Sequence, residues 1–246
     1  MLNAFLYGLL ATSSLVLGGV LGLWFSIGKR TLGIIMAFGA GVLISAVAYE
    51  LVFEALKHTR GSGATVVGIF TGAFAFYFSD MLIGKLGGSD RKAIEASLQS
   101  KLVVPLVLAI ILDGIPESAV IGMSIFTDGS VSMAMLVAVF ISNLPEAIAG
   151  TTGMRSGGWK AKKIMLLWLA IAVVCALATL AGYVLVSNIS AEWVAFINAF
   201  AAGAILTMLA NTMMPEAYAH GGKLAGLFTV LGFVVSVAIV LLERAS

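Results

Sequence analysis

Two short segments place acidic residues and prolines inside hydrophobic runs that are long enough to cross a bilayer. They read Leu-Asp-Gly-Ile-Pro-Glu-Ser at 112–118 and Ile-Ser-Asn-Leu-Pro-Glu-Ala at 141–147. An ionisable side chain at that depth costs roughly 2.5–3.5 kcal/mol on insertion scales, and a proline removes a backbone hydrogen bond. Because the chain does both twice with the same Pro-Glu core, the sequence predicts a polar site between helices.

The polar side chains of these segments have spacings that place them on common helix faces. Asp113 and Glu117 are four residues apart, so they share one face of a helix. In the second segment, Ser142 and Asn143 precede Glu146 by four and three residues. Carboxylate, amide and hydroxyl oxygens are hard donors that suit a divalent cation, so we predict that these five residues are metal ligands.

Three acidic side chains in an empty site would repel one another. Asp113, Glu117 and Glu146 together would suffer desolvation and mutual repulsion, so we expect the empty site to hold at least one proton and to release it when a cation binds. Each proline also frees the carbonyl group four residues before it, which adds an oxygen donor. The alternative is that the prolines are hinges and that the acids hydrogen-bond to one another.

Further polar residues fall near the ends of predicted helices and could mark a path to and from this site. They are Glu50, Glu54, Asn211, Glu216 and His220. Each alone is also explained as an interfacial residue, since helix ends tolerate charge. The single cysteine, Cys175, is expected to be a small packed residue. The tryptophans at 24, 159, 168 and 193 are expected to anchor helices at the membrane interface.

The elements that must position these residues are membrane-spanning helices. Of 246 residues, 61% are hydrophobic and 11% are charged, whereas about 25% are charged in soluble domains. The sequence predicts an all-α polytopic membrane protein with one transmembrane domain over 1–246. Eight apolar runs have about the 20 residues that a helical span needs. They cover about 4–27, 31–55, 64–84, 102–126, 131–154, 164–187, 193–217 and 223–242.

The distribution of basic residues predicts the orientation. With the N-terminus outside, the inner loops, of which the longest covers about 85–101, hold most of the Lys and Arg residues, and the outer side holds Lys57, Arg60 and Arg244. The positive-inside rule then places both termini outside the cytosol. The first run lacks a preceding basic residue and is followed by Lys29 and Arg30, so we expect a retained span rather than a cleaved signal peptide.

Two internal similarities predict a repeat. The segment 38–55 aligns without gaps on 200–217, with identities that include Phe38/Phe200 and Gly41/Gly203. The similarity between the two Pro-Glu segments lies between these two. The predicted layout is three spans, a central pair and three spans, with inverted topology, an arrangement common in transporters whose site lies near the midplane.

At these residues the chain resembles the ZIP family of zinc and iron permeases over nearly its whole length. The resemblance implies eight spans, external termini, a three-two-three inverted arrangement and Pro-Glu metal motifs in spans four and five. The family pattern in span four is His-Asn-x-Pro-Glu-Gly, with a similar His- or Gln-led motif in span five. Here Asp113 stands where histidine is usual, Gly114 replaces an amide, and Ser142 replaces His or Gln. The usual acid of span six is absent.

These features lead to an expected function. The resemblance implies a transporter that moves a divalent metal into the cytosol across the plasma membrane, such as a bacterial inner membrane. Zinc prefers nitrogen or sulfur ligands, so an oxygen-only site extends the expected substrates to Mn²⁺, Fe²⁺ or another hard ion. No cofactor or nucleic-acid partner is expected. The small-residue helix faces permit a homodimer.

Three other functions are compatible with the same residues. A membrane metal sensor or regulatory subunit would bind a cation without passing it on. An intramembrane enzyme would use the acids as a protease-like pair, which the helix-bending prolines disfavour. An exporter, or a carrier of protons or another solute, would use the same kind of site.

Overall fold

The computed structural model describes residues 1–59, 63–85, 103–127, 129–187 and 189–245, and the described chain is helical. The inner loop predicted at 85–101 lies outside the described residues except for Lys85. Spans one to four are α1 (Leu2–Trp24), α2 (Lys29–Ala46) continued by η1 (Val47–Val52) and α3 (Phe53–Thr59), α4 (Ala64–Ile83) and α5 (Val103–Thr127). Spans five to eight are α6 (Met133–Ser156), α7 (Ala161–Val186), α8 (Ala191–Met208) continued by η4 (Leu209–Met213) and α9 (Met214–Gly221), and α10 (Leu224–Ala245).

The fold class predicted from the hydrophobic runs is confirmed. Within the described residues, eight helical segments are long and apolar enough to cross a membrane. Two of them, 29–57 and 191–221, have 29 and 31 residues. These two segments are longer than the 20 residues that cross a bilayer, and each contains a π-helical stretch.

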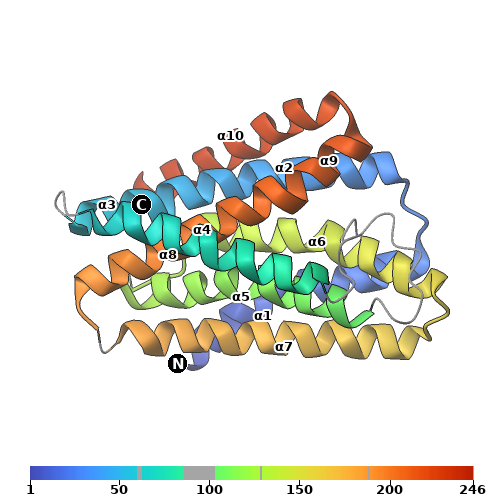
Figure 1. The fold of residues 1–246 in the computed structure, drawn as a ribbon, viewed down its shortest axis with the longest axis horizontal. Coiled ribbons are helices and arrows are strands. Elements are labelled where there is room, and N and C mark those ends of the chain that lie inside the picture. Colours follow the sequence, from blue (N-terminus) through green and yellow to red (C-terminus); the bar gives the residue numbers. More distant parts are fainter. Residues whose placement is uncertain (60–62, 86–102, 128, 188, 246) are drawn as a thin grey trace.

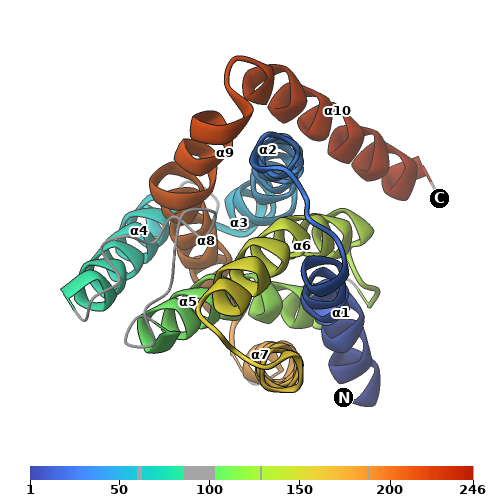
Figure 2. The same cartoon turned by 90° about the vertical axis from the view of Figure 1, so that its right-hand side faces the viewer.

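The helices pack as two groups (Figures 1 and 2). One group contains α1, α5, α6 and α7, in which α1 packs on α6 and α7, and α5 packs on α7. The other contains α2, α4, α8 and α10, in which α2 packs on α10 and α4 packs on α8. Contacts between the groups are made mainly by α2 against α6. The two helices with Pro-Glu segments therefore belong to one group.

The second group contains the repeat that the sequence predicts. Alignment of 38–55 on 200–217 superposes the first residue of η1, Val47, on the first residue of η4, Leu209, so both copies become π-helical at the same position. The close helix crossings are equivalent too. An added Cβ at Gly41 would overlap the carbonyl oxygen of Thr229 in α10, and one at the aligned Gly203 would overlap that of Ile69 in α4. Small residues at such crossings let helix backbones approach closely in a membrane.

The two ends of the bundle differ in charge. Both chain termini lie toward the left of Figure 1, at what we call the terminal end. The described basic residues of the opposite end are Lys29, Arg30, Lys85, Arg155, Lys160, Lys162, Lys163 and Lys223, whereas the terminal end has Lys57 and Arg244. The described acids of the terminal end are Glu50, Glu54, Glu192 and Glu243. The charge asymmetry that the sequence analysis used is therefore present between the two ends.

Trp168 corrects one expectation from the sequence. It has 0% exposure and lies between α7 and α6, where its indole Nε1 donates a hydrogen bond to Thr151 Oγ1 at 2.7 Å. The indole N–H group of tryptophan needs a hydrogen-bond acceptor, which is why tryptophan is common at the membrane interface. Here Thr151 accepts this hydrogen bond inside the protein, so Trp168 is a core residue and not an interface anchor. Trp24 and Trp193 are exposed at helix ends as expected.

Candidate metal site

Helix α5 carries Asp113 and Glu117 near the middle of the bundle. Glu117 lies about 21 Å along the helix from its first residue, at 1.5 Å per residue, so about 15 Å remain to its last residue. Asp113 is 8% exposed and Glu117 is 2% exposed. Pro116 stands inside a helix that continues on both sides of it. The sequence therefore buries two carboxyl groups on one face of a helix whose other residues are mostly apolar.

Helix α6 presents the second Pro-Glu segment at a similar depth. Ser142 and Asn143 are buried, at 2% and 4% exposure, and Glu146 is half-buried. The hydroxyl of Ser142 donates to the carbonyl oxygen of Val139 at 3.1 Å, which leaves its lone pairs as acceptors. The Nδ2 atom of Asn143 is buried without a hydrogen-bond partner among the described residues. An unpaired buried NH₂ group usually marks a place where an acceptor such as water belongs.

The acids of the two helices are close enough to interact. The carboxyl group of Glu117 interacts electrostatically with those of Glu146 and Asp113, and α5 contacts α6. In the described part of the chain, however, no three His, Cys, Asp or Glu side chains converge tightly enough to hold one metal ion. The two helices thus bring the predicted residues into one neighbourhood without forming a closed carboxylate cage.

The candidate site also borders the other helix group. A Cβ added to Gly39 of α2 would stand 3.3 Å from the Cα atom of Ser142 and 3.1 Å from the Cε atom of Met213 in η4. The lack of a side chain at Gly39 therefore lets α2 pass close to the site. Met213 is buried, at 1% exposure, on the same side. The site lies beside the boundary between the two groups of helices.

Cys175 of α7 lies beside the site, which sequence reasoning missed. It is 1% exposed, as a packed residue should be, but a Cβ added to Gly114 would stand 2.9 Å from its Sγ atom. The thiol also interacts electrostatically with Glu117. Nothing near Cys175 in the sequence indicates this contact, which arises because α7 packs on α5.

A pocket lies between the candidate site and the terminal end of the bundle. Its cavity volume is about 30 Å³. The polar residues that line it are Glu50, Glu54, Ser124, Thr127, Ser132 and Asn198, and the apolar ones are Leu51, Val120, Met135 and Val194. Val120 follows Glu117 by one turn on the same face of α5, and Ser124 follows by two turns. The pocket and the candidate site therefore share one face of α5.

The structure separates the other proposed pathway residues. Glu50 and Glu54 both line this pocket. Glu216 and His220 lie on α9 at the opposite end, where Glu216 is 4% exposed and His220 packs beside Gly33 near the start of α2. Asn211 is exposed on η4 and is not packed inside the chain. Acidic residues thus lie toward both ends of the bundle, but Asn211 is exposed at its surface.

Comparison with known proteins finds similarity to a plant protein. No family model matches the chain. The chain is similar to a protein of Arabidopsis thaliana named "Putative zinc transporter", with 26% identity over 217 residues, which are 87% of this chain and 34% of that protein. The chain therefore spans about a third of the length of that relative.

Proposed function

We propose that this protein transports a divalent metal cation across a membrane, through a site formed by α5 and α6. The observation that carries the proposal is the burial of Asp113, Glu117 and Asn143 in the middle of adjacent apolar helices, with Glu146 near enough to influence Glu117 electrostatically. Buried acids at membrane depth are costly and usually mark an ion path. The similarity to a protein named for zinc transport supports the same class of function.

The metal ligands in this proposal are Asp113, Glu117, Asn143 and Glu146, with Ser142 as a weaker donor. An arrangement that is not a closed cage suits transport, because a cation must leave its site as well as enter it. A cation would draw the carboxylates of Glu117 and Glu146 toward each other by neutralising their repulsion. The oxygen donors favour Mn²⁺ or Fe²⁺, and the relative points to Zn²⁺.

The orientation in this proposal rests on the distribution of charge. Basic residues concentrate at the end opposite the termini, and such residues mark the cytosolic side. We therefore place both termini and the pocket on the side of the membrane away from the cytosol. We expect the metal to enter through the pocket. Movement would follow the electrochemical gradient, with one group of helices shifting or rocking against the other around the site.

Metal uptake into proteoliposomes tests the function. Purified protein should accumulate Zn²⁺ or Mn²⁺ in vesicles loaded with a metal-sensitive dye. Glu117→Ala and Glu146→Ala should each lower the rate of metal uptake at least about tenfold. Loss of a residue that only hydrogen-bonds to a metal ligand typically costs about tenfold or more, and loss of a ligand itself should cost at least as much. Glu192→Ala is the matched control, since Glu192 is exposed at the start of α8.

The same measurement separates transport from sensing. A sensor would bind the metal without accumulation in the vesicles, and its binding would still depend on Glu117. Normal uptake by either of the two site variants would reject the site assignment.

A further inference from the structure

The donor atoms that border the α5–α6 site decide which cations it prefers. The ligands proposed above on these two helices are oxygen donors, which suit hard cations such as Mn²⁺. A thiol donor would shift the preference toward Zn²⁺ and Cd²⁺, since soft thiolate ligands select such ions. The chain has one cysteine, Cys175, which is 1% exposed in the middle of α7. Its surroundings show whether the site has access to a thiol.

The Cys175 thiol faces the part of α5 that carries the proposed ligands. A Cβ atom added to Gly114 would stand 2.9 Å from Sγ, so no side chain separates the sulfur atom from the backbone of α5 at the residue after Asp113. The thiol also interacts electrostatically with Glu117. Gly114, Glu117 and Ser118 lie three and four residues apart, so they share one face of α5. This face meets the sulfur atom.

Ser118 supplies an independent observation that points to a ligand. Its side chain is 0% exposed and is a neighbour of the Cys175 thiol. A serine inside a helix often donates to a carbonyl group of the preceding turn. Among the described residues, however, no hydrogen bond of normal geometry satisfies the Oγ atom of Ser118. A buried polar group in this state usually marks a place where water or an ion belongs, and here that place is next to a thiol and to Glu117.

Packing explains only part of the surroundings of Cys175. The residue belongs to a buried apolar cluster that includes Leu15, Ala147 and Trp168, where a small side chain fits. The same apolar groups limit the access of water to the sulfur atom, and such a shell tunes how a metal binds. The sulfur therefore borders both an apolar cluster and the polar groups of α5.

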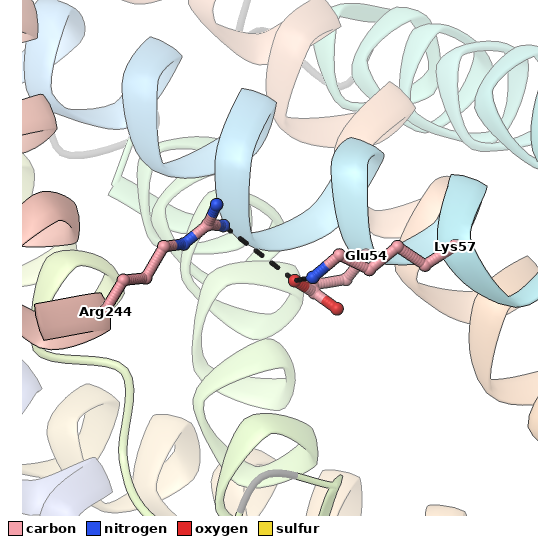
Figure 3. Close-up of polar contacts among 3 residues, drawn as sticks. All are labelled: Glu54, Lys57 and Arg244. Atoms are coloured by element: carbon pink, nitrogen blue, oxygen red, sulfur yellow. Dashed lines mark hydrogen bonds and ion pairs between the residues drawn. The ribbon is translucent and has the colours of Figure 1, made fainter.

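The pocket near the terminal end lacks a comparable donor. Among the described residues that line it, none is a cysteine or a histidine. Basic groups also hold its Glu54 carboxylate: Lys57 Nζ lies 2.6 Å from Oε1, and Arg244 Nη2 lies 3.9 Å from the same atom (Figure 3). The pocket therefore lacks the donors that distinguish Zn²⁺ from Mn²⁺ most strongly.

We propose that the Cys175 sulfur is a metal ligand that makes the α5–α6 site select Zn²⁺ and Cd²⁺ over Mn²⁺. Glu117 and the sulfur bind one ion from neighbouring helices, and the Ser118 hydroxyl donates to the sulfur. The thiol proton is released as the metal–sulfur bond forms. In the described structure these side chains do not converge tightly, so the ion draws them together. The inference rests on the proposed function for the existence of the site and adds the class of cation.

Cd²⁺ binding to the purified full chain tests this inference by absorption spectroscopy. A cadmium–thiolate bond has an ultraviolet charge-transfer band, and with one cysteine in the chain the band reports on Cys175 alone. The band should rise to saturation with added Cd²⁺, and Cys175→Ser should abolish it. Glu117→Ala should raise the Cd²⁺ concentration for half-saturation at least about tenfold, whereas Glu192→Ala, at an exposed acid, should not change it. The absence of a band in the unmodified protein would overturn the proposal.

The ratio of two affinities distinguishes a ligand from a packing residue. Cys175→Ser should weaken the binding of Cd²⁺ at least about tenfold and that of Mn²⁺ less than about twofold, because the thiolate contributes to the soft ion. A residue that only packs would change both affinities alike. Calorimetry with each metal measures the two values, and an unchanged ratio would reject the thiol ligand.

A relocated thiol keeps the test independent of folding defects. Gly114→Cys combined with Cys175→Ala places a sulfur atom in the same space from α5, because a Cβ at residue 114 points at the present sulfur. This double variant should regain the cadmium band, whereas Gly114→Ser with Cys175→Ala should not. A folded Gly114→Cys/Cys175→Ala protein without the band would show that the metal does not reach this space.

The outcomes also separate this inference from the proposed function. The band is measured in detergent and does not require transport, so a Cys175-dependent band without uptake in proteoliposomes rejects transport alone. Uptake that depends on Glu117 but has the same preference between Cd²⁺ and Mn²⁺ in Cys175→Ser rejects the thiol ligand alone.

Discussion

Gly114 of α5 lies directly against the Sγ atom of Cys175 in α7. A methyl group at residue 114 would stand 2.9 Å from that sulfur. The chain thus has no side chain at the residue after Asp113, and a thiol from the neighbouring helix fills the space. The contact places the one cysteine of the protein beside Glu117, with which the thiol interacts electrostatically.

Cys175 can therefore report on occupation of the α5–α6 site. A small methanethiosulfonate reagent should modify it slowly, because the residue is 1% exposed. Bound Zn²⁺ or Mn²⁺ should slow the reaction further by filling the space next to Glu117. The rate is measured by intact-protein mass spectrometry.

Two variants control this labelling experiment. Glu117→Ala should abolish the protection by metal, and Glu192→Ala should retain it. Equal labelling rates with and without metal in the unmodified protein would show that the bound ion and Cys175 are not neighbours.

The contact between Gly114 and Cys175 also predicts a stability coupling. Gly114→Ala should lower the stability of the folded protein by about 1–2 kcal/mol, because the added methyl group crowds the sulfur atom. Cys175→Ala in the same chain removes that atom and should restore most of the loss. Thermal unfolding in detergent measures the two single variants and the double variant as a cycle. Additive losses in the double variant would contradict the contact.

Proton competition predicts the pH dependence of uptake. The carboxyl groups of Asp113, Glu117 and Glu146 bind metal only when they are ionised. Lowering the pH adds protons to the same groups, so uptake in proteoliposomes should fall from about pH 7.5 to about pH 5.5, with a rise in the metal concentration needed for half-maximal uptake. Binding of metal in weak buffer should release protons, which a pH-sensitive dye detects. Uptake that does not change over this range would contradict a carboxylate site.

Hydropathy and spacing predicted the spans and the polar faces for clear physical reasons. A run of about 20 apolar residues is long enough to cross a bilayer as a helix and is best explained as one. Residues four apart in a helix, such as Asp113 and Glu117, lie on the same face. The alignment of residues 38–55 on 200–217 likewise anticipated the equivalence of Gly41 and Gly203. These features depend on local sequence, which one chain shows directly.

Features that depend on contacts between distant helices could not be predicted in this way. Trp168 is buried because Thr151 accepts its hydrogen bond, and nothing near Trp168 in the sequence reveals that partner. Cys175 lies beside Gly114 only because α7 packs on α5. The pocket needs Asn198, Glu50 and Ser124 from three helices. Hydrophobic patterns identify helices, but they do not show which faces meet.

Two glycines of α10 provide a matched test of the helix packing. A Cβ added to Gly232 would overlap the carbonyl oxygen of Phe38 in α2, whereas one added to Gly226 would meet open space. Gly232→Ala should therefore lower stability by about 1–3 kcal/mol, since backbone atoms must move. Gly226→Ala should be neutral or stabilising by up to about 1 kcal/mol, because alanine favours the helix. Both variants have the same change in composition and differ only in their neighbours, so equal melting temperatures would contradict the α2–α10 crossing.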